Sequence, residues 1–354
     1  MKTFFGYRLL TDLTGEGAGT CLWGFGEKDG SVYFIKKFLK PKYPYEDYVL
    51  TPEKIERNKK RCRNMVQKKL RIYDAVNRLS DGNDVRIHEF FRVEQSYYLT
   101  MEKVDDLKWS VNDVYSLPET ERSRLCALIA HAVARLHTGG LAHSDLKHDN
   151  VLFTRTENGM LTAKVIDFDS AFFETDDLRP EEISGDQVYF SPEAIAFING
   201  MDARPGCKAD VFALGVLFHQ YFSGEVPGFD SSRCDYCGEA ALSGQRLRIA
   251  PVIPPDVRTL LGGMLATDPG NRPTTQYVYE FFQKRAGFAP VTEHVDLHDD
   301  DLGPVRYCIE CGRRHRSEAY YCPECAAKRS GKDHVIDPDA FFHPGTDLLR
   351  GRSL

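Results

Sequence analysis

The chain has 354 residues, of which 42% are hydrophobic, so it holds enough apolar material for one large core or two smaller ones. Lys and Arg total 46 against 52 Asp and Glu, and the formal net charge of -6 gives no general reason to expect nucleic acid as a partner. The first residues lack the apolar stretch of a signal peptide, and no run of about 18 apolar residues could span a bilayer. We therefore expect a cytoplasmic protein that does not enter a membrane.

The first hundred residues favour strands arranged around one long helix. Between the strands, apolar residues at three- and four-residue spacings predict a helix that starts near Thr51 and stops at Asp81. Strands are predicted from apolar and β-branched stretches at 7–13, 21–25, 32–35, 85–92 and 97–101. This part of the chain should form a small sheet with one helix.

Beyond residue 115 the pattern becomes helical. Residues 116–119 have the capping-box sequence that opens a helix, which is expected to continue to Gly139. The most apolar helix, from Asp210 to Phe222, is hydrophobic on nearly every face and should lie inside a second, helix-rich lobe.

The strongest motif is a short polar loop followed by an acidic triplet. The loop reads His143-Ser-Asp-Leu-Lys-His-Asp-Asn150, and Asp167-Phe-Asp169 follows a predicted strand. The pair resembles the eukaryotic-like, Ser/Thr-type protein kinase family, which has an H-x-D-L-K-x-x-N loop and a DFG triplet in this order. The resemblance implies an α+β, bilobal protein-kinase-like fold, with a small β-rich N-lobe and a larger helical C-lobe.

The same resemblance implies a role for four residues. Asp145 would orient the substrate hydroxyl and accept its proton, and Lys147 would neutralise the transferring phosphate. Asn150 and Asp167 would hold Mg²⁺ or Mn²⁺. Phosphoryl transfer needs positioning and charge neutralisation more than covalent help, so one short loop can supply both. Any one of these residues alone is more often a solvated loop residue, but the two motifs together favour catalysis.

An ATP-binding loop and a hinge are expected by the same resemblance. Gly15 and Gly17 belong to a segment that resembles the glycine-rich loop over the ATP phosphates, although Thr20 replaces its third glycine. The predicted hinge, which would hydrogen-bond adenine and begin with a gatekeeper methionine, comprises Met101, Glu102 and Val104.

Lys36, on a predicted strand, matches the family lysine that binds the α- and β-phosphates. The family pairs this lysine with a glutamate of the helix that follows. Glu56 lies at a suitable distance after Lys36, whereas counting back from the next strands points near Lys69 or Ile72. The sequence leaves open whether Glu56 or no residue is the partner.

The second lobe has further matches. Glu193 and Arg272 resemble the buried ion pair of the family, and Asp210 matches the residue that anchors the catalytic loop backbone.

Three further residues depart from the family pattern in ways that bear on mechanism. Ser144 replaces the arginine that reads activation-loop phosphorylation, so such phosphorylation should matter less. Asp169 replaces the glycine of the DFG triplet and should resist a flip of Phe168. Asp186 stands where Ser/Thr kinases carry threonine, which leaves the choice between Ser/Thr and Tyr acceptors open.

Six of the ten cysteines form CxxC pairs, which point to metal in a reducing compartment. One pair, Cys234 and Cys237, is half a site that either borrows ligands or stays unbound. The other two pairs have the spacing of a zinc ribbon with one structural Zn²⁺. The four predicted zinc ligands are Cys308, Cys311, Cys322 and Cys325.

These features predict an ATP- and magnesium-dependent protein kinase. Its acceptors would be hydroxyl groups of proteins, including those of the kinase itself. The alternatives are a pseudokinase scaffold that docks through its zinc ribbon, and a small-molecule kinase on a related fold. The expected partners are a protein substrate and a docking partner for the ribbon. The predicted parts are an N-lobe at 1–104, a C-lobe at 105–285, an acidic linker at 286–304, a zinc ribbon at 305–328 and a tail at 329–354.

Overall fold

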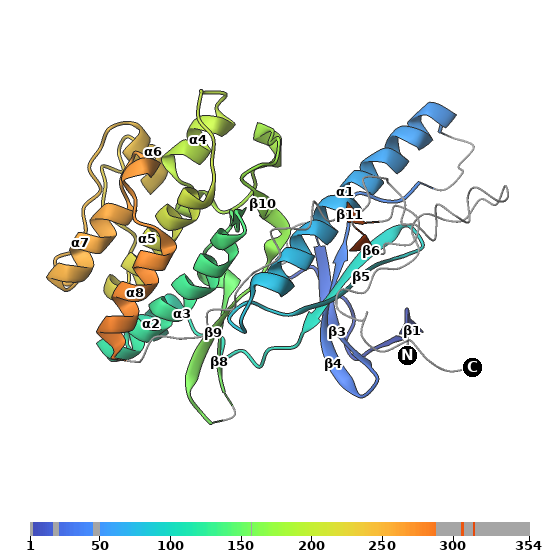
Figure 1. Ribbon diagram of the computed structural model, residues 1–354, viewed down its shortest axis with the longest axis horizontal. Helices are drawn as coiled ribbons and strands as arrows, with labels where there is room; N and C mark the ends of the chain where they lie inside the picture. Colours follow the sequence, from blue (N-terminus) through green and yellow to red (C-terminus); the bar gives the residue numbers. More distant parts are fainter. Residues whose placement is uncertain are drawn as a thin grey trace. The chain divides into compact units, whose positions relative to one another are not determined.

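The computed structural model describes residues 3–16, 21–44, 50–156, 158–287, 306–307 and 314–315. Most of them fall into two compact units (Figure 1). One unit contains residues up to Asn77 together with Arg86–Lys103, and the other contains Arg78–Val85 together with the described chain from Val104 to Gly287. Two short strands, β11 (Arg306–Tyr307) and β12 (Arg314–His315), pair antiparallel with each other.

The first unit is built on a six-stranded antiparallel sheet, in the order β1-β2-β3-β4-β6-β5. Its strands are β1 (Thr3–Phe4), β2 (Tyr7–Leu9), β3 (Cys21–Lys28), β4 (Ser31–Phe38), β5 (Ile87–Val93) and β6 (Ser96–Glu102). Asp29 and Gly30 connect β3 to β4 with φ of 53° and 80°, the positive values that a tight hairpin turn requires.

The strand predicted at 7–13 is wrong beyond Leu9. The N–H groups of Leu10 and Thr11 both donate to the carbonyl of Phe25, at 2.9 and 3.3 Å. Two residues facing one partner interrupt a ladder, as in a bulge. The chain meets the sheet again at a single bridge between Thr14 and Trp23.

The predicted long helix is present as α1 (Pro52–Leu79). It begins where predicted and ends two residues before Asp81. Its inner face is buried at Cys62, Ile72, Tyr73 and Val76, and the Tyr73 ring packs edge-on against Phe90 of β5. Near its C-terminal end, Asn77 exchanges two hydrogen bonds with the backbone of Ile87, of 2.7 and 3.0 Å. These contacts fix α1 against the sheet of its own unit.

A buried polar network joins the start of the chain to the far edge of the sheet. The Tyr7 hydroxyl donates to Glu89 at 2.7 Å and lies 3.0 Å from the Thr100 hydroxyl. Lys28 pairs with the same carboxylate at 2.7 Å, and its ammonium lies over the Tyr7 ring. Burial is the main cause that raises the pKa of Tyr7 above its usual value.

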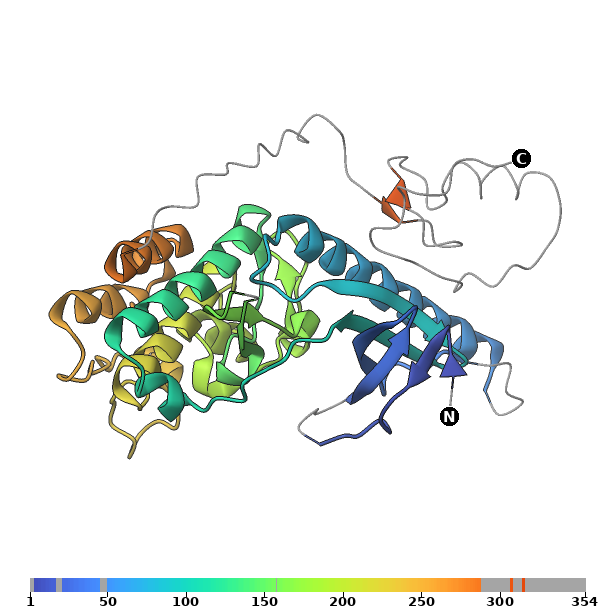
Figure 2. The same ribbon diagram turned by 90° about the horizontal axis from the view of Figure 1, so that it is seen from below.

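The second unit is mainly helical (Figures 1 and 2). Its helices are α2 (Val111–Tyr115), α3 (Glu119–Thr138), α4 (Pro192–Ile198), α5 (Cys207–Ser223), α6 (Cys237–Leu242), α7 (Pro255–Met264) and α8 (Thr275–Ala286). Its strands form two antiparallel pairs, β7 (Leu141–Ala142) with β10 (Phe172–Phe173), and β8 (Val151–Arg155) with β9 (Leu161–Val165).

The apolar helix predicted from 210 to 222 is confirmed as α5, the buried centre of this unit. Its rings at Phe218 and Phe222 pack against Phe282 of α8, with centroids 5.4 and 5.8 Å apart. Gly224 ends the helix with φ of 80°, in the left-handed conformation common after a helix C-terminus.

The capping box predicted at 116–119 is wrong. The helix α3 does begin at Glu119, but Pro118 precedes it and provides no side-chain cap. The Ser116 hydroxyl instead donates to the carbonyl of Asn112 at 2.7 Å and closes α2.

The segment Arg78–Val85 is bound to the second unit through its backbone. The N–H of Val85 donates to the carbonyl of Val165 in β9 at 2.9 Å, and the N–H of Val165 donates to the carbonyl of Asn83 at 2.8 Å. Asp81 pairs with His131 of α3, and Lys164 donates to the carbonyl of Gly82 at 2.9 Å.

Within this segment, Asp84 is 2% exposed, and neither of its carboxyl oxygens has a hydrogen-bond partner in the described part of the chain.

Among the described residues, no helix is both long and apolar enough to cross a membrane.

Candidate functional site

The predicted catalytic loop lies between β7 and β8 and is anchored by α5. The Asp210 carboxylate accepts the N–H of His143 at 2.7 Å and of Ser144 at 2.9 Å. Ser144 has φ of 68°, a strained value for a residue other than glycine. Because Asp210 is 1% exposed, these two charge-assisted hydrogen bonds are well placed to hold that conformation.

Asp145 is held through both of its carboxylate oxygens. The side-chain amide of Asn150 donates to Oδ2 at 2.9 Å, and the backbone N–H of Asp186 donates to Oδ1 at 3.1 Å. The Lys147 ammonium lies 3.3 Å from Oδ2. The structure therefore brings together Asp145, Lys147 and Asn150, three of the residues singled out from the sequence.

The contact from Asp186 depends on Gly185, whose role was missed in the sequence. Gly185 has φ of +158°, and a Cβ placed on it would lie 3.1 Å from Asp145 Oδ1 and 2.9 Å from the Phe190 ring. A side chain here would crowd the carboxylate that the next N–H must reach. The glycine itself was the available signal, but its partner lies 41 residues earlier.

Asn150 and Asp167 fit the chemistry of a hard cation. The Asn150 amide nitrogen donates to the carbonyl of Asp145 at 2.7 Å as well as to its carboxylate, so both N–H groups point at Asp145. The amide oxygen is left as the acceptor for another ligand. The N–H of Ile166 donates to the carbonyl of Asn150 at 3.0 Å, which ties the loop to the residue before Asp167. Amide and carboxylate oxygens are ligands that Mg²⁺ prefers.

The acidic triplet adopts a tight turn. Asp167 has φ of 62°, its Oδ1 accepts the N–H of Asp169 at 3.3 Å, and Asp169 lies within the single helical turn Phe168–Ser170. The Phe168 ring is 3% exposed and packs 5.1 Å from the ring of His143. This turn places Asp167 in the left-handed conformation, which Asp tolerates better than most other residue types.

Asp186, the third departure from the family pattern, uses its carboxylate locally. Its Oδ1 accepts the N–H of Val188 at 3.0 Å and caps the short turn Gln187–Tyr189. The contact to Asp145 therefore comes from the backbone of this residue and not from its side chain.

The predicted nucleotide-binding residues lie mainly on the sheet of the first unit. Lys36 stands on β4 opposite Trp23 of β3 and Leu99 of β6. Met101 is 7% exposed and faces Phe34 across the same sheet.

The hinge segment has its own backbone contacts. Glu102 accepts the N–H of Arg86 on its carboxylate at 2.8 Å, and the carbonyl of Val104 accepts the N–H of Asp106 at 3.0 Å. Gly15 precedes β3, and Gly17 lies outside the described residues.

Glu56, one of the two options for the partner of Lys36, faces solvent. Its side chain is 65% exposed and pairs with Arg63 of the same helix at 2.5 Å. Lys69 lies with its ammonium over the rings of Phe38 and Tyr73, and Ile72 is fully buried. The carboxylate of Glu56 is therefore engaged within α1.

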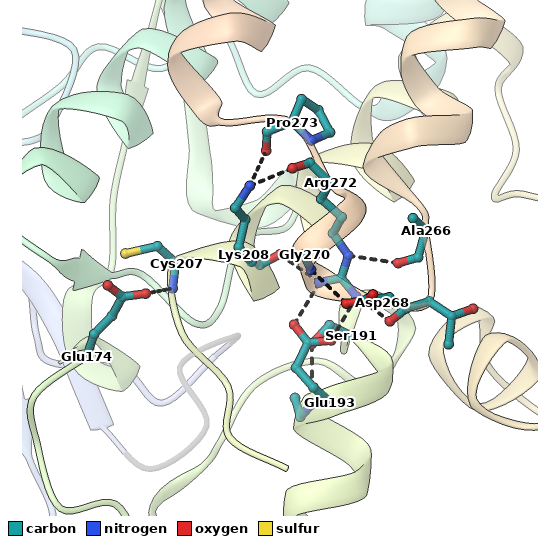
Figure 3. Close-up of polar contacts among 12 residues, drawn as sticks. Glu174, Ser191, Glu193, Cys207, Lys208, Ala266, Asp268, Gly270, Arg272 and Pro273 are labelled. Carbon is teal, nitrogen blue, oxygen red and sulfur yellow. Dashed lines mark hydrogen bonds and ion pairs between the residues drawn. The ribbon is translucent and has the colours of Figure 1, made fainter.

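Glu193 and Arg272 form the expected buried pair. Two parallel hydrogen bonds of 2.7 and 2.8 Å join them, and the Arg272 side chain is fully buried (Figure 3). The guanidinium also donates to backbone carbonyls, among them those of Ala266 and Lys208, at 2.8 and 2.7 Å. Lys208 in turn donates to the carbonyl of Arg272 at 2.5 Å. Figure 3 shows how this pair links α4 to the start of α5 and to the loop before α8.

Cys234 and Cys237 have different surroundings. Cys237 packs in the core beside Phe212 and Val216, and burial raises the pKa of its thiol to about 12. Cys234 is partly exposed and accepts a hydrogen bond from Gln245 at 3.4 Å.

No group of three potential metal-binding His, Cys, Asp or Glu residues occurs in the described part of the chain. The four predicted zinc ligands, Cys308, Cys311, Cys322 and Cys325, lie outside it.

Comparisons with known proteins agree with this geometry. The chain is 28% identical over 223 residues to sperm motility kinase Z of Mus musculus. This match covers 62% of the chain and 43% of that protein. It is 29% identical over 196 residues to serine/threonine-protein kinase zyg-8 of Caenorhabditis elegans, covering 53% and 24%. It is 30% identical over 238 residues to CBL-interacting protein kinase 25 of Oryza sativa subsp. japonica, covering 64% and 44%. The matched regions thus span less than half the length of these relatives.

The family model of the protein kinase domain matches residues 48–282, which include the catalytic loop, the acidic triplet and the buried pair. The match begins after Lys36 and the glycine-rich segment. With about two thirds of its length matched, the chain belongs to the protein kinase family.

Proposed function

We propose that this chain is an ATP- and magnesium-dependent protein kinase that transfers the γ-phosphoryl group to a Ser or Thr hydroxyl of a protein, its own included. The observation that supports the proposal most strongly is the positioning of the Asp145 carboxylate. This carboxylate is held by donors from two separate segments and lies beside Lys147. Catalysis of phosphoryl transfer depends on such positioning.

Each residue of the loop has a distinct part in the proposed reaction. Asp145 accepts the proton of the substrate hydroxyl, since a carboxylate with one hydrogen bond on each oxygen retains further lone pairs. The Lys147 ammonium lies 3.3 Å from Asp145 Oδ2, and there its positive charge would stabilise the transferring phosphate. Bound magnesium would neutralise charge on the phosphates, and Asn150 and Asp167 would hold it.

The nucleotide side of the proposal rests on the family resemblance and on the placement of residues in the sheet. Lys36 would bind the α- and β-phosphates, and Gly15 and Gly17 would lie over the phosphates. The hinge residues that would bind adenine are Met101, Glu102 and Val104.

The test compares two carboxylates of the same loop. Purified full-length chain, incubated with labelled ATP, magnesium and a generic Ser/Thr acceptor, should transfer phosphate. Asp145→Asn should lose at least a hundredfold in kcat, because general bases contribute about 10²–10⁴. Asp149→Asn, at an exposed residue of the same loop, is the matched control and should stay near the wild type. Equal rates for Asp145→Asn and the wild type would refute the role, and no transfer by the wild type would favour a pseudokinase scaffold.

The remaining sequence predictions accompany this proposal. Cys308, Cys311, Cys322 and Cys325 are proposed to bind one structural Zn²⁺, on the strength of their spacing alone. The domain limits at 104, 285, 304 and 328, a docking partner for the ribbon and the cytoplasmic location also stay predictions.

A further inference from the structure

The positive charge of the chain is concentrated on α1. This helix carries ten Lys and Arg against three Asp and Glu, which gives it a charge of +7. With -6 on the whole chain and +7 on α1, the remainder carries -13. The helix is therefore a cationic element of an otherwise acidic protein.

Three of these cations form an exposed cluster near the start of the helix. Arg57, Lys60 and Arg61 are exposed, and their three- and four-residue spacing places them on adjoining parts of one face. Their side chains make no hydrogen bond or ion pair within the part of the chain that the structure describes, whereas the Arg63 side chain is paired with Glu56. We call Arg57, Lys60 and Arg61 the basic face. In Figure 1 the N-terminal turns of α1, which carry it, rise away from the strands.

The basic face is electrostatically unfavourable for the isolated helix. Like charges three or four residues apart destabilise a helix, and Arg57 stands at these spacings from Lys60 and Arg61. Glu53 and Glu56 stand four residues before Arg57 and Lys60, but among the described residues neither forms an ion pair with the basic face, and Glu56 pairs with Arg63 instead. No acidic side chain follows in the helix before Asp74. A bound anion would relieve this repulsion, so the arrangement suits a surface that has an anionic partner.

We propose that the basic face docks an acidic segment of the protein substrate, an inference that rests on the proposed kinase function. The span from residue 57 to residue 71, which has no acidic side chain, is about 21 Å long at 1.5 Å per residue. An extended acidic segment of about six or seven residues would match that length. The net charge of -6 on the whole chain disfavours a long polyanion such as nucleic acid, or an anionic membrane, as the partner.

Docking of this kind acts on substrate capture. An acidic segment held on α1 raises the local concentration of the attached hydroxyl, so KM falls while kcat stays the same. None of the three residues of the basic face is among those assigned to the reaction or to nucleotide binding.

The first experiment measures binding without catalysis. A fluorescein-labelled octaglutamate peptide is titrated with the full chain, and its anisotropy is followed at low salt. Each exposed ion pair changes an equilibrium constant by roughly two- to fivefold, so Arg57→Gln/Lys60→Gln/Arg61→Gln should weaken binding about tenfold. Gln keeps the helix propensity of Arg and Lys, so the variant should fold.

A matched control removes the same charge elsewhere. Arg233→Gln/Arg246→Gln/Lys284→Gln neutralises three exposed cations of the second unit and should weaken binding less than twofold. Equal weakening by the two triple variants would overturn the proposal. Tighter binding of a labelled oligothymidine, or of vesicles rich in phosphatidylserine, through the same three residues would also overturn it.

The second experiment uses a Ser/Thr acceptor peptide with and without an octaglutamate extension. The extension should lower KM for the wild type and the control variant about tenfold, but not for the triple variant of α1, with kcat unchanged in all three. A KM that is independent of the extension would overturn the proposal. If octaglutamate binding depends on the basic face while no protein transfers phosphate, the docking surface stands and the kinase function fails.

Discussion

Asp84→Asn should change how the stability of the protein depends on pH. Asp84 is fully buried, and burial raises the pKa of its carboxyl from an ordinary value of 3.8 to about 8. Asp81 adds to this increase, whereas Lys164, Arg135 and a polar interaction with Ser80 oppose it. The folded state therefore holds this proton over a pH range in which the unfolded chain has already released it.

The sign and size of the effect follow from that difference. The stabilising contribution of the protonated group is complete below about pH 4 and is lost as the pH rises to about 8. Each pH unit in this window costs about 1.4 kcal/mol, so the free energy of unfolding should fall by roughly 2–3 kcal/mol between pH 5.5 and 7.5. The side-chain amide of the Asp84→Asn variant cannot ionise, and the variant should lose this part of the slope.

Urea unfolding of wild type and Asp84→Asn, followed by circular dichroism at both pH values, measures the two slopes. Other groups titrate in both proteins, so the difference between the slopes reports on Asp84. Asp256→Asn, at an exposed carboxylate that pairs with Arg285, serves as the control and should keep the wild-type slope. Parallel slopes for wild type and Asp84→Asn would show that the buried carboxyl titrates normally, and the reasoning from burial would be refuted.

Three further outcomes are expected. Gly185→Ala should lower kcat at least tenfold with little change in the melting temperature, because the added Cβ would crowd the Asp145 carboxylate. An unchanged kcat in steady-state kinetics would contradict this. Glu193→Gln should cost about 3–5 kcal/mol in urea unfolding, since it leaves a buried guanidinium without its counter-ion, and a loss below 1 kcal/mol would count against that view. Cys308→Ser/Cys311→Ser should remove one zinc per chain in metal analysis and leave phosphate transfer to a generic acceptor intact; undiminished zinc would show that the ligands are wrong.

The parts of the fold that the sequence predicted are those in which local pattern and tertiary packing agree. The helix α5 is apolar all round and followed by Gly224, and both features persist in the buried centre of the second unit. The residue types of Asp29 and Gly30, between two predicted strands, likewise agree with the tight turn that joins β3 to β4. The capping box at Ser116 failed because that hydroxyl completes the short helix α2, and a four-residue pattern contains no sign of the preceding turn.

The candidate site shows the same division. The contacts among Asp145, Lys147 and Asn150 lie within one loop and could be expected from its residue types and order. The donation from the backbone of Asp186 could not, because it depends on chain folding over 41 residues and on the absence of a side chain at Gly185. Asp84 was equally hidden, since it follows Asp81-Gly-Asn in what reads as an ordinary polar turn.

The network around Tyr7 bears on where a recombinant fragment of this protein can be cut. A fragment that starts at residue 48, where the family match begins, would lack Tyr7 and Lys28 and would leave the Glu89 carboxylate without both donors. It would also lack four of the six strands of the sheet. Expression plasmids for this kinase domain should therefore begin upstream of Tyr7.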